Sequence, residues 1–275
     1  MKIENMTYDR TGKLLSEKIE IKPKGMCLTE GKVVIITGAT LGIGLACAER
    51  FIQERAKVAI TGIEDDIGEA NAKFLTDCGG ECTYYHANAF ERREVSAMVK
   101  AVMEKYGRID ILLNCAGYNI PASFEQATPD QFRQMVGIHG LAHCYTLWEV
   151  LPVMEAQGGG VILEFGSKSS DKPAAHDPFY CFAKAGIKQM SKNLNLEFGH
   201  KNIRINCICP GPTVSGMTTT ENGEIIPDFQ HIGKLVPRGR YAMPEDIAKT
   251  AVWICSDEAD FIAGLTFNVD GGIVT

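Results

Sequence analysis

The chain has 275 residues, a formal net charge of −6 and a hydrophobic fraction of 45%, which is enough to build a sizeable core. Its length suits one large α/β domain or two small ones. The acidic balance and the lack of any basic run argue against a polyanion-binding surface, so we expect no nucleic-acid partner. No apolar stretch approaches the roughly 20 residues of a membrane helix, and the first residues lack the apolar core of a secretion signal. We therefore expect a cytoplasmic protein with no membrane partner.

Ten cysteines are more than usual, but their positions do not suggest a framework. Cys207 and Cys209 alternate along a strand-like run, and Cys78 and Cys82 flank a Gly-Gly turn. No closely spaced pair is matched by a second pair or by clustered histidines, as a zinc site requires. We expect reduced thiols that pack as small hydrophobic side chains, and no metal.

Residues 1–30 are polar and mixed in charge, and we treat them as an extension that precedes a domain over residues 31–275. The extension would wrap a neighbouring subunit, cover the site or remain a tail. From Lys32 onward, short apolar runs alternate with segments of helical periodicity. Strands are expected over 33–37, 57–61, 82–86, 109–114, 161–165, 203–209 and 265–269. Helices are expected over 43–55, 92–106, 130–154, 179–199 and 245–256.

The expected strands are rich in Val, Ile and Leu without polar alternation, which indicates burial on both faces of a sheet. Alternation of strands with helices predicts parallel strands joined by right-handed crossovers. The sequence therefore predicts a single doubly wound α/β domain, in which a parallel seven-stranded sheet carries helices on both faces.

A glycine-rich turn, Thr37–Gly44, follows the first expected strand and opens the first expected helix. Gly38, Gly42 and Gly44 permit a tight turn, close approach to a pyrophosphate and close packing of the helix on the strand. The free amides and the positive dipole end of the helix also favour phosphate there. Glycine-rich turns occur for structural reasons too, but this position between strand and helix favours a dinucleotide site.

The second expected strand ends in three consecutive acids, Glu64–Asp66. An acidic side chain there accepts a hydrogen bond from the ribose 2′-hydroxyl of NAD, whereas an arginine would accommodate the 2′-phosphate of NADP. No Lys or Arg occurs between Lys57 and Lys73, and carboxylates repel a phosphate dianion. We expect NAD(H) rather than NADP(H), with Glu64 as the ribose contact. The alternative is that the acids only stabilise the first turn of a helix.

Tyr180 is followed four residues later by Lys184 and is preceded at a distance of thirteen residues by Ser167. A free tyrosine has a pKa of about 10 and is a poor acid-base catalyst near neutral pH. A cation one turn along the same helix face can lower that pKa. The spacing predicts a proton-transfer site to which Ser167 adds a hydroxyl from a separate loop.

Residues 212–238 form a long connection that contains three prolines and an Asn-Gly pair. Such a loop in a compact domain is usually functional or mobile, and it follows a strand end, where open α/β sheets bind ligands. We expect a substrate lid over about residues 212–238, with a merely long surface loop as the alternative.

These features together resemble the short-chain dehydrogenase/reductase family over about residues 30–275. The resemblance rests, in chain order, on Thr37-Gly-x-x-x-Gly-Ile-Gly44, Asn114-Cys-Ala-Gly117, Ser167, Tyr180-x-x-x-Lys184, Pro210-Gly211 and Val269-Asp-Gly-Gly272. It implies a single Rossmann-type domain that assembles as a homotetramer or homodimer through the two long helices, 130–154 and 179–199.

The resemblance also implies roles for individual residues. Tyr180 would exchange a proton with a secondary alcohol, Lys184 would lower its pKa and bind the nicotinamide ribose, and Ser167 would donate to the carbonyl oxygen. Asn88 stands where the family often has an aspartate near the adenine, and an amide can serve that contact. The residues expected to bind the cofactor are Gly38, Leu41, Gly42, Ile43, Gly44, Gly62, Glu64, Asn88, Ala89, Asn114, Ala116, Gly117, Tyr180, Lys184, Pro210, Gly211, Thr213 and Ser215.

The fourth catalytic position of the family, normally asparagine, falls on His139. In the family this residue acts mainly through a backbone carbonyl that holds a water near the catalytic lysine. Two interpretations of His139 remain open: it preserves or joins a proton relay as a titrating group, or it fills a kink in the helix.

The resemblance implies NAD(H)-dependent interconversion of a secondary alcohol and a ketone. Residues 137–141 and the apolar lid resemble those of bacterial hydroxysteroid dehydrogenases, which points to a bulky apolar substrate such as a hydroxysteroid or bile acid. Polyol or sugar dehydrogenases are the alternative. A ketoacyl reductase is disfavoured because the usual basic residues that select NADPH are absent, and an enoyl reductase because its tyrosine-lysine spacing differs. A hypothesis from another class is a non-catalytic dinucleotide-binding sensor, which only the change at His139 supports.

Overall fold

The computed structural model describes residues 27–216, 218–219, 226 and 232–274. The expected N-terminal extension lies almost wholly outside these residues, and the expected lid lies partly outside them. No helix in the described part of the chain is both long enough and apolar enough to cross a membrane.

A parallel seven-stranded sheet forms the centre of the molecule, in the order β3-β2-β1-β4-β5-β6-β7. Its strands are β1 (Val33–Ile36), β2 (Lys57–Gly62), β3 (Glu81–His86), β4 (Ile111–Asn114), β5 (Gly160–Phe165), β6 (Ile203–Pro210) and β7 (Thr266–Val269). All seven expected strands are present, which confirms the predicted sheet. The strand order reverses between β1 and β4, and a doubly wound sheet opens a ligand crevice at such a point.

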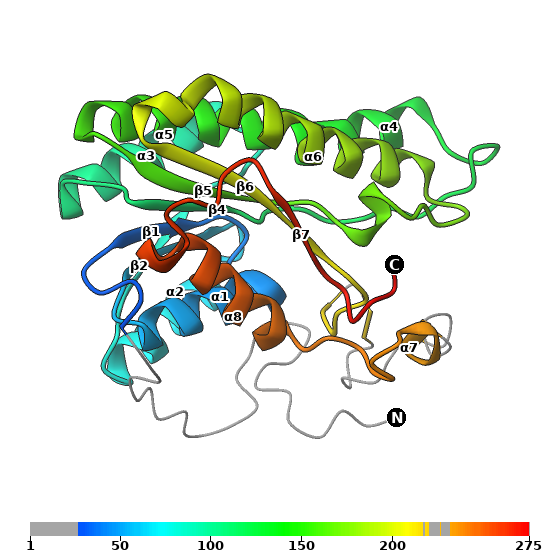
Figure 1. The fold of residues 1–275 in the computed structure, drawn as a ribbon, viewed down its shortest axis with the longest axis horizontal. Coiled ribbons are helices and arrows are strands. Elements are labelled where there is room, and N and C mark those ends of the chain that lie inside the picture. Colours follow the sequence, from blue (N-terminus) through cyan, green and yellow to red (C-terminus); the bar gives the residue numbers. More distant parts are fainter. Residues whose placement is uncertain (1–26, 217, 220–225, 227–231, 275) are drawn as a thin grey trace.

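Helices cover both faces of the sheet, so the doubly wound prediction is confirmed (Figure 1). One layer holds α1 (Gly42–Gln53), α2 (Asp65–Asp77) and α8 (Pro244–Cys255), and the other holds α3 (Arg92–Tyr106), α5 (Ala142–Gln157) and α6 (Pro178–Phe198). The chain also forms α4 (Pro129–Val136) and a single turn, α7 (Ile232–Leu235). α2 begins at Asp65, directly after Glu64, so the acidic run does stand at a helix start.

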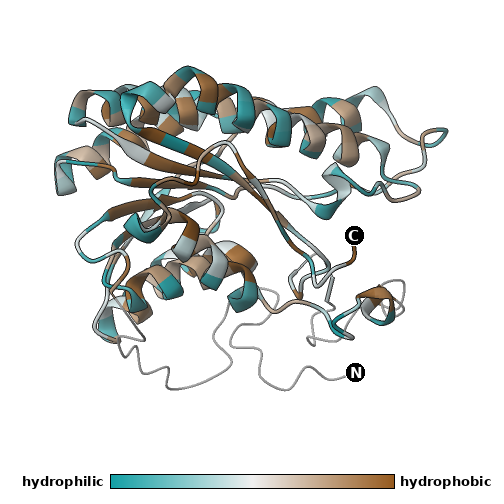
Figure 2. Cartoon of the chain, viewed as in Figure 1, coloured by the Kyte–Doolittle hydropathy of each residue, from teal (hydrophilic) through white to brown (hydrophobic). Residues whose placement is uncertain are grey.

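Two hydrophobic cores, one on each side of the sheet, account for the three layers. Successive residues of a strand point to opposite faces, and in β1 Val34 and Ile36 belong to the core under α1 and α8. Val33 and Ile35 belong to the core under α3 and α5. Figure 2 shows the hydrophobic residues concentrated in the strands between the layers. Burial on both faces explains why the strands carry apolar runs without alternation.

The expected helix over 130–154 is not continuous, and this expectation was wrong in detail. A π-helical turn, Gly137–Leu141, separates α4 from α5. Such turns place an extra residue in a helix and occur often at functional sites. His139 is the central residue of the turn, and it is buried. The kink proposed for this residue is therefore present.

The start of α1 packs directly on the glycine turn. A Cβ at Gly44 would lie 2.5 Å from the carbonyl oxygen of Gly38 and 2.8 Å from the Cα of Ala39. Both neighbours are backbone atoms, so a side chain at this position would have to move the turn itself.

We predict that Gly44→Ala lowers the free energy of unfolding by about 1–3 kcal/mol, because overpacking forces the backbone apart. Gly199→Ala is the matched control, since its backbone is right-handed helical and a Cβ there would meet open space. Urea unfolding of the two variants and the wild type measures the difference. Equal stability of Gly44→Ala and the wild type would contradict the close packing.

Candidate active site

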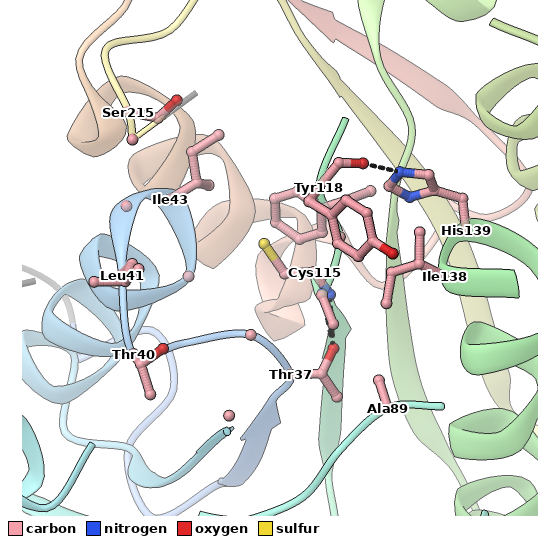
Figure 3. A pocket seen from close by; sticks show the side chains of 18 of the residues that line it. Thr37, Thr40, Leu41, Ile43, Ala89, Cys115, Tyr118, Ile138, His139 and Ser215 are labelled. Atoms are coloured by element: carbon pink, nitrogen blue, oxygen red, sulfur yellow. Dashed lines mark hydrogen bonds between the residues drawn. The ribbon is translucent and has the colours of Figure 1, made fainter. Parts of the chain in front are cut away.

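A cavity of about 580 Å³ lies at the carboxyl ends of the central strands. Its walls come from the segments that follow β1, β2, β3, β4, β5 and β6, together with α6 and the π-helical turn. Figure 3 shows Thr40 and Leu41 of the first turn on one side and His139 on the other. This is the edge at which open parallel sheets bind ligands.

The structure brings almost all of the predicted site residues to this one cavity. Ser167, Tyr180, Lys184 and His139 line it. So do the predicted cofactor contacts Gly38, Leu41, Gly42, Ile43, Gly44, Gly62, Glu64, Asn88, Ala89, Ala116, Gly117, Pro210, Gly211, Thr213 and Ser215. The exception is Asn114, whose side chain is buried behind the cavity wall.

The glycine turn has the backbone geometry that its composition predicts. Gly38 and Gly42 adopt positive φ angles of 62° and 55°, a region that side chains with a Cβ rarely occupy. A Cβ at Gly38 would lie 2.7 Å from the Cα of Ala116. The turn after β1 therefore packs against the loop after β4, and the two loops form one floor of the cavity.

Thr37 joins these two loops and was not among the predicted site residues. Its Oγ1 accepts hydrogen bonds from the backbone N–H groups of Cys115 and Ala116, both at 3.0 Å; Figure 3 shows the side chain beside that loop. It also donates to Oδ1 of Asn114 at 3.3 Å. A threonine directly after a buried strand was the available signal, but its partners lie almost 80 residues away in the chain.

Glu64 is the acid that faces the cavity. Its Oε2 accepts a hydrogen bond from Oγ1 of Thr40 at 2.9 Å, which holds the carboxylate at the rim. The neighbouring Asp65 is engaged elsewhere, since Tyr84 and His86 bond to its carboxylate at 2.8 and 2.7 Å. Those hydrogen bonds lower the pKa of Asp65, that from His86 first. Only Glu64 of the three acids lines the cavity.

Lys184 is a buried cation that ties α6 to the end of β5. It is 4% exposed, and its Nζ donates to the carbonyl oxygen of Phe165 at 2.7 Å. The ammonium lies 5.7 Å from the centre of the Tyr180 ring, one turn earlier on α6. Burial lowers the pKa of Lys184 to about 8.

The phenol of Tyr180 behaves differently from the sequence-based expectation. Its ring is partly exposed, yet loss of surrounding water raises the pKa of Tyr180 to about 12, and the hydrogen bond with Ser167 only partly opposes this. We expected Lys184 to lower the pKa below 10. The ammonium instead points at the carbonyl of Phe165, so desolvation dominates, and the phenol is protonated at neutral pH.

Ser167 is held in place by a short turn that it caps itself. Its Oγ accepts from the backbone N–H of Ser169 at 3.1 Å, and this bond starts a 3-10 turn over Lys168–Ser170. The hydroxyl proton is not used in that bond, because the oxygen acts as the acceptor there, and the Ser167 side chain also forms a hydrogen bond with Tyr180. Ser167 therefore lies at the cavity wall in a fixed position beside the Tyr180 hydroxyl.

His139 presents an unpaired acceptor beside the tyrosine. It is 1% exposed, and its Nε2 lies 2.7 Å from the carbonyl oxygen of Tyr118. A carbonyl only accepts, so Nε2 carries the proton and Nδ1 of the neutral ring is an acceptor. Nδ1 is buried and has no hydrogen-bond partner among the described residues. The ring stands edge-on to Tyr180, with centroids 5.2 Å apart.

Burial lowers the pKa of His139 well below the ordinary value, and the positive charge of Lys184 adds to the effect. The ring also needs a glycine in front of it, because a Cβ at Gly117 would lie 2.4 Å from its Cε1. His139 thus lies in the irregular turn of the helix and lines the cavity at the same time, while its part in a proton relay stays a prediction.

Residues 38–274 match the family model described as enoyl-(acyl carrier protein) reductase. Among curated relatives, the 2,5-dichloro-2,5-cyclohexadiene-1,4-diol dehydrogenase LinX of Sphingobium indicum is 31% identical over 243 residues, which covers 88% of this chain and 96% of the relative. The chain belongs to the short-chain dehydrogenase/reductase family of oxidoreductases.

Two solved structures are similar over nearly the whole described fold. A 7α-hydroxysteroid dehydrogenase in complex with NADH and 7-oxo glycochenodeoxycholic acid has a TM-score of 0.84 and 30% identity, covering 90% of this chain and 95% of its own. The L-sorbose reductase from Gluconobacter frateurii with NADPH and L-sorbose also has a TM-score of 0.84 and 30% identity, covering 91% and 99%. The two differ in both cofactor and substrate.

We predict that His139 stays neutral through the pH range in which an exposed histidine, with a pKa of about 6.5, gains its proton. Burial disfavours the cation, so the folded-state pKa is depressed and the ring stays neutral as the pH falls past 6.5. Imidazole NMR measures this directly. His86, whose pKa its bond to Asp65 raises, provides an internal comparison that shifts the opposite way. Titration of His139 at or above 6.5 would contradict the assignment.

Proposed function

We propose that this protein is an NAD(H)-dependent oxidoreductase that interconverts a secondary alcohol and a ketone, with Tyr180 as the acid and base. The observation that supports this most strongly is that Tyr180, Ser167 and Lys184 line the same cavity as the glycine turn and Glu64. A proton-transfer group and a dinucleotide cradle in one cavity are what hydride transfer to a carbonyl requires.

The residues present fit a nicotinamide dinucleotide. Gly38 and Gly42, which adopt positive φ angles, have no side chains that would keep a pyrophosphate from the turn, and the amino end of α1 presents free amides to it. Glu64, held by Thr40, would accept from an adenosine ribose 2′-hydroxyl. Lys184 would bind the nicotinamide ribose. When bound, the cofactor would supply or take up the hydride.

Tyr180 moves the proton. Because its pKa lies near 12, the hydroxyl holds its proton at neutral pH and can give it to a carbonyl oxygen as that oxygen becomes an alkoxide. Ser167 donates a hydrogen bond to the same oxygen, where negative charge develops. The cation of Lys184, 5.7 Å from the Tyr180 ring, stabilises the phenolate that remains. Oxidation of an alcohol uses the same groups in reverse.

His139 takes the fourth catalytic position as an acceptor. Its depressed pKa makes it a poor proton donor, while its unpaired Nδ1 beside Tyr180 can hold a water or hydroxyl donor near Lys184. We infer that it orders one step of the proton relay without changing its own charge.

The proposed substrate is a bulky apolar ketone or alcohol such as a hydroxysteroid or bile acid. The similarity to a 7α-hydroxysteroid dehydrogenase with a bound oxo bile acid supports this, and Tyr118, Ile138 and Ile232 give the cavity an apolar lining. A sugar or polyol is the second candidate, supported by the equal similarity to L-sorbose reductase.

We also propose that the chain self-associates, as a homotetramer or homodimer, and works in the cytoplasm. Phe124, Phe132 and Phe182 are 74%, 38% and 61% exposed and form one aromatic cluster with Phe179, built from α4, α6 and the loop before α4. Exposed aromatic clusters of this kind mark interfaces. Each of the ten cysteines is a free thiol in the structure, which suits a reducing compartment.

Tyr180→Phe is predicted to lower kcat at least about 100-fold, since general acid-base catalysis contributes about 10²–10⁴-fold, and to leave NADH binding nearly unchanged. Tyr106→Phe is the control, because that hydroxyl bonds to Thr83 away from the cavity. NADH oxidation with a steroid ketone and with a sugar ketone, assayed side by side, measures rate and substrate class together. Full activity of Tyr180→Phe would refute the catalytic role, and wild-type NADH binding without any turnover would favour a sensor.

The cofactor preference is predicted to depend on Glu64. Wild-type protein should bind NADH more tightly than NADPH. Glu64→Gln should lower the ratio of the NADPH dissociation constant to the NADH dissociation constant by about tenfold, because the repulsion of a 2′-phosphate is lost. Asp66→Asn is the matched control, as Asp66 is exposed and does not line the cavity. Fluorescence titration gives two dissociation constants for each protein, one for NADH and one for NADPH. A wild-type preference for NADPH would overturn the assignment.

A further inference from the structure

A second ionisable pair lies behind the cavity, between α5 and the sheet. The side chains of His143 on α5 and Glu164 on β5 are 1% and 0% exposed, and Nδ1 of the histidine lies 2.5 Å from Oε2 of the glutamate. Neither residue lines the cavity. Nothing in the proposed proton transfer uses them, so their presence needs another explanation.

The hydrogen-bond partners of His143 and Glu164 determine where the protons of this pair lie. Nε2 of His143 lies 3.2 Å from the carbonyl oxygen of Ala116, and a carbonyl only accepts, so Nε2 carries a proton. One further proton then occupies the bond between Nδ1 and Glu164. The pair is an imidazolium with a carboxylate, or a neutral ring with a carboxylic acid, and its net charge is zero in both forms.

Glu164 also holds Asn114, the predicted cofactor contact that lies behind the cavity. Its Oε1 accepts from Nδ2 of Asn114 at 3.0 Å. Nδ2 also donates to the backbone oxygen of His143 at 3.2 Å. The Glu164 carboxylate therefore holds the end of β4 and the following loop at two points. It binds Asn114 directly, and it binds Ala116 through the ring of His143.

Ala116 connects the hydrogen bonds of His143 and Glu164 to the dinucleotide site. Its N–H donates to Thr37 and its carbonyl accepts from His143, so both sides of the residue are fixed. The turn at Gly38 packs on its Cα, where a Cβ of Gly38 would be only 2.7 Å away. A shift of Ala116 would therefore displace the glycine turn.

We propose that His143 and Glu164 are positioning residues for the dinucleotide site: they set the loop 114–117 on which the glycine turn packs, and so set the affinity for the cofactor. The inference rests on the function proposed above. A buried polar pair adds little net stability compared with apolar side chains of similar volume, which would pack α5 on the sheet equally well. Apolar side chains, however, cannot form the hydrogen bonds that hold Asn114 and Ala116 in place.

The test compares variants that keep or remove this hold. Glu164→Gln retains every bond, because its amide oxygen accepts from Asn114 and its NH₂ group donates to Nδ1 of a neutral His143. Glu164→Leu and His143→Leu remove the hold. Ser191→Ala is the control, since Ser191 is equally buried and its hydroxyl donates to the backbone oxygen of Ile187 in its own helix.

The readout is the dissociation constant of NADH, measured by fluorescence well below each variant's melting temperature, so that loss of stability alone does not change it. Glu164→Gln and Ser191→Ala should bind NADH within about twofold of the wild type. The leucine variants should bind NADH about threefold to tenfold more weakly, which is the range that the loss of one hydrogen bond gives. The KM for NADH should rise by the same factor while the KM for the ketone stays constant.

If the leucine variants do not fold, Glu164→Asp provides the test in their place. It retains the charge but is one methylene too short to reach both partners, so it should weaken NADH binding severalfold where Glu164→Gln does not. Two results would overturn the inference: folded Glu164→Leu, His143→Leu or Glu164→Asp that bind NADH as the wild type does, or Glu164→Gln that binds as weakly as Glu164→Leu. If the wild type itself failed to bind NADH, the proposed function would fall first.

Discussion

The hydrogen bond from the buried ammonium of Lys184 to the carbonyl oxygen of Phe165, at 2.7 Å, is the contact on which the candidate site depends. It joins α6, which carries Tyr180, to the end of β5, which leads into Ser167. A charge at this depth is costly unless it is paired or hydrogen-bonded. Lys184, Tyr180 and Ser167 therefore meet because the carbonyl at the end of β5 accepts a hydrogen bond from the buried lysine.

Burial also decides the chemistry of the site. It lowers the pKa of Lys184 to about 8 and raises that of Tyr180 to about 12, while it keeps His139 neutral. The wall of the cavity thus holds a protonated phenol, an ammonium and a neutral acceptor. These three groups suit the donation of one proton to a developing alkoxide better than exposed groups would. The buried surroundings fix the charge state of each group.

Much of the fold could be predicted from local sequence patterns, because its causes are local. Apolar runs without alternation predicted the strands, and the spacing of Gly38, Gly42 and Gly44 predicted the turn. A kink at His139 was one of two interpretations of the sequence, but we expected one continuous helix over residues 130–154, because the periodicity did not mark a π-helical turn there. The pair of His143 and Glu164 escaped prediction because its contact depends on how α5 packs on β5. The rise in the pKa of Tyr180 was missed because the direction in which Lys184 points is set by tertiary packing.

A crystal structure with NAD⁺ and a secondary alcohol bound tests the central claim most directly. The account predicts that the dinucleotide crosses the cavity with its pyrophosphate at the glycine turn and its adenosine ribose at Glu64. The hydroxyls of Ser167 and Tyr180 should both lie within hydrogen-bond distance of the alcohol oxygen, with Lys184 at the nicotinamide ribose. A dinucleotide bound elsewhere, or an alcohol oxygen out of reach of Tyr180, would contradict it.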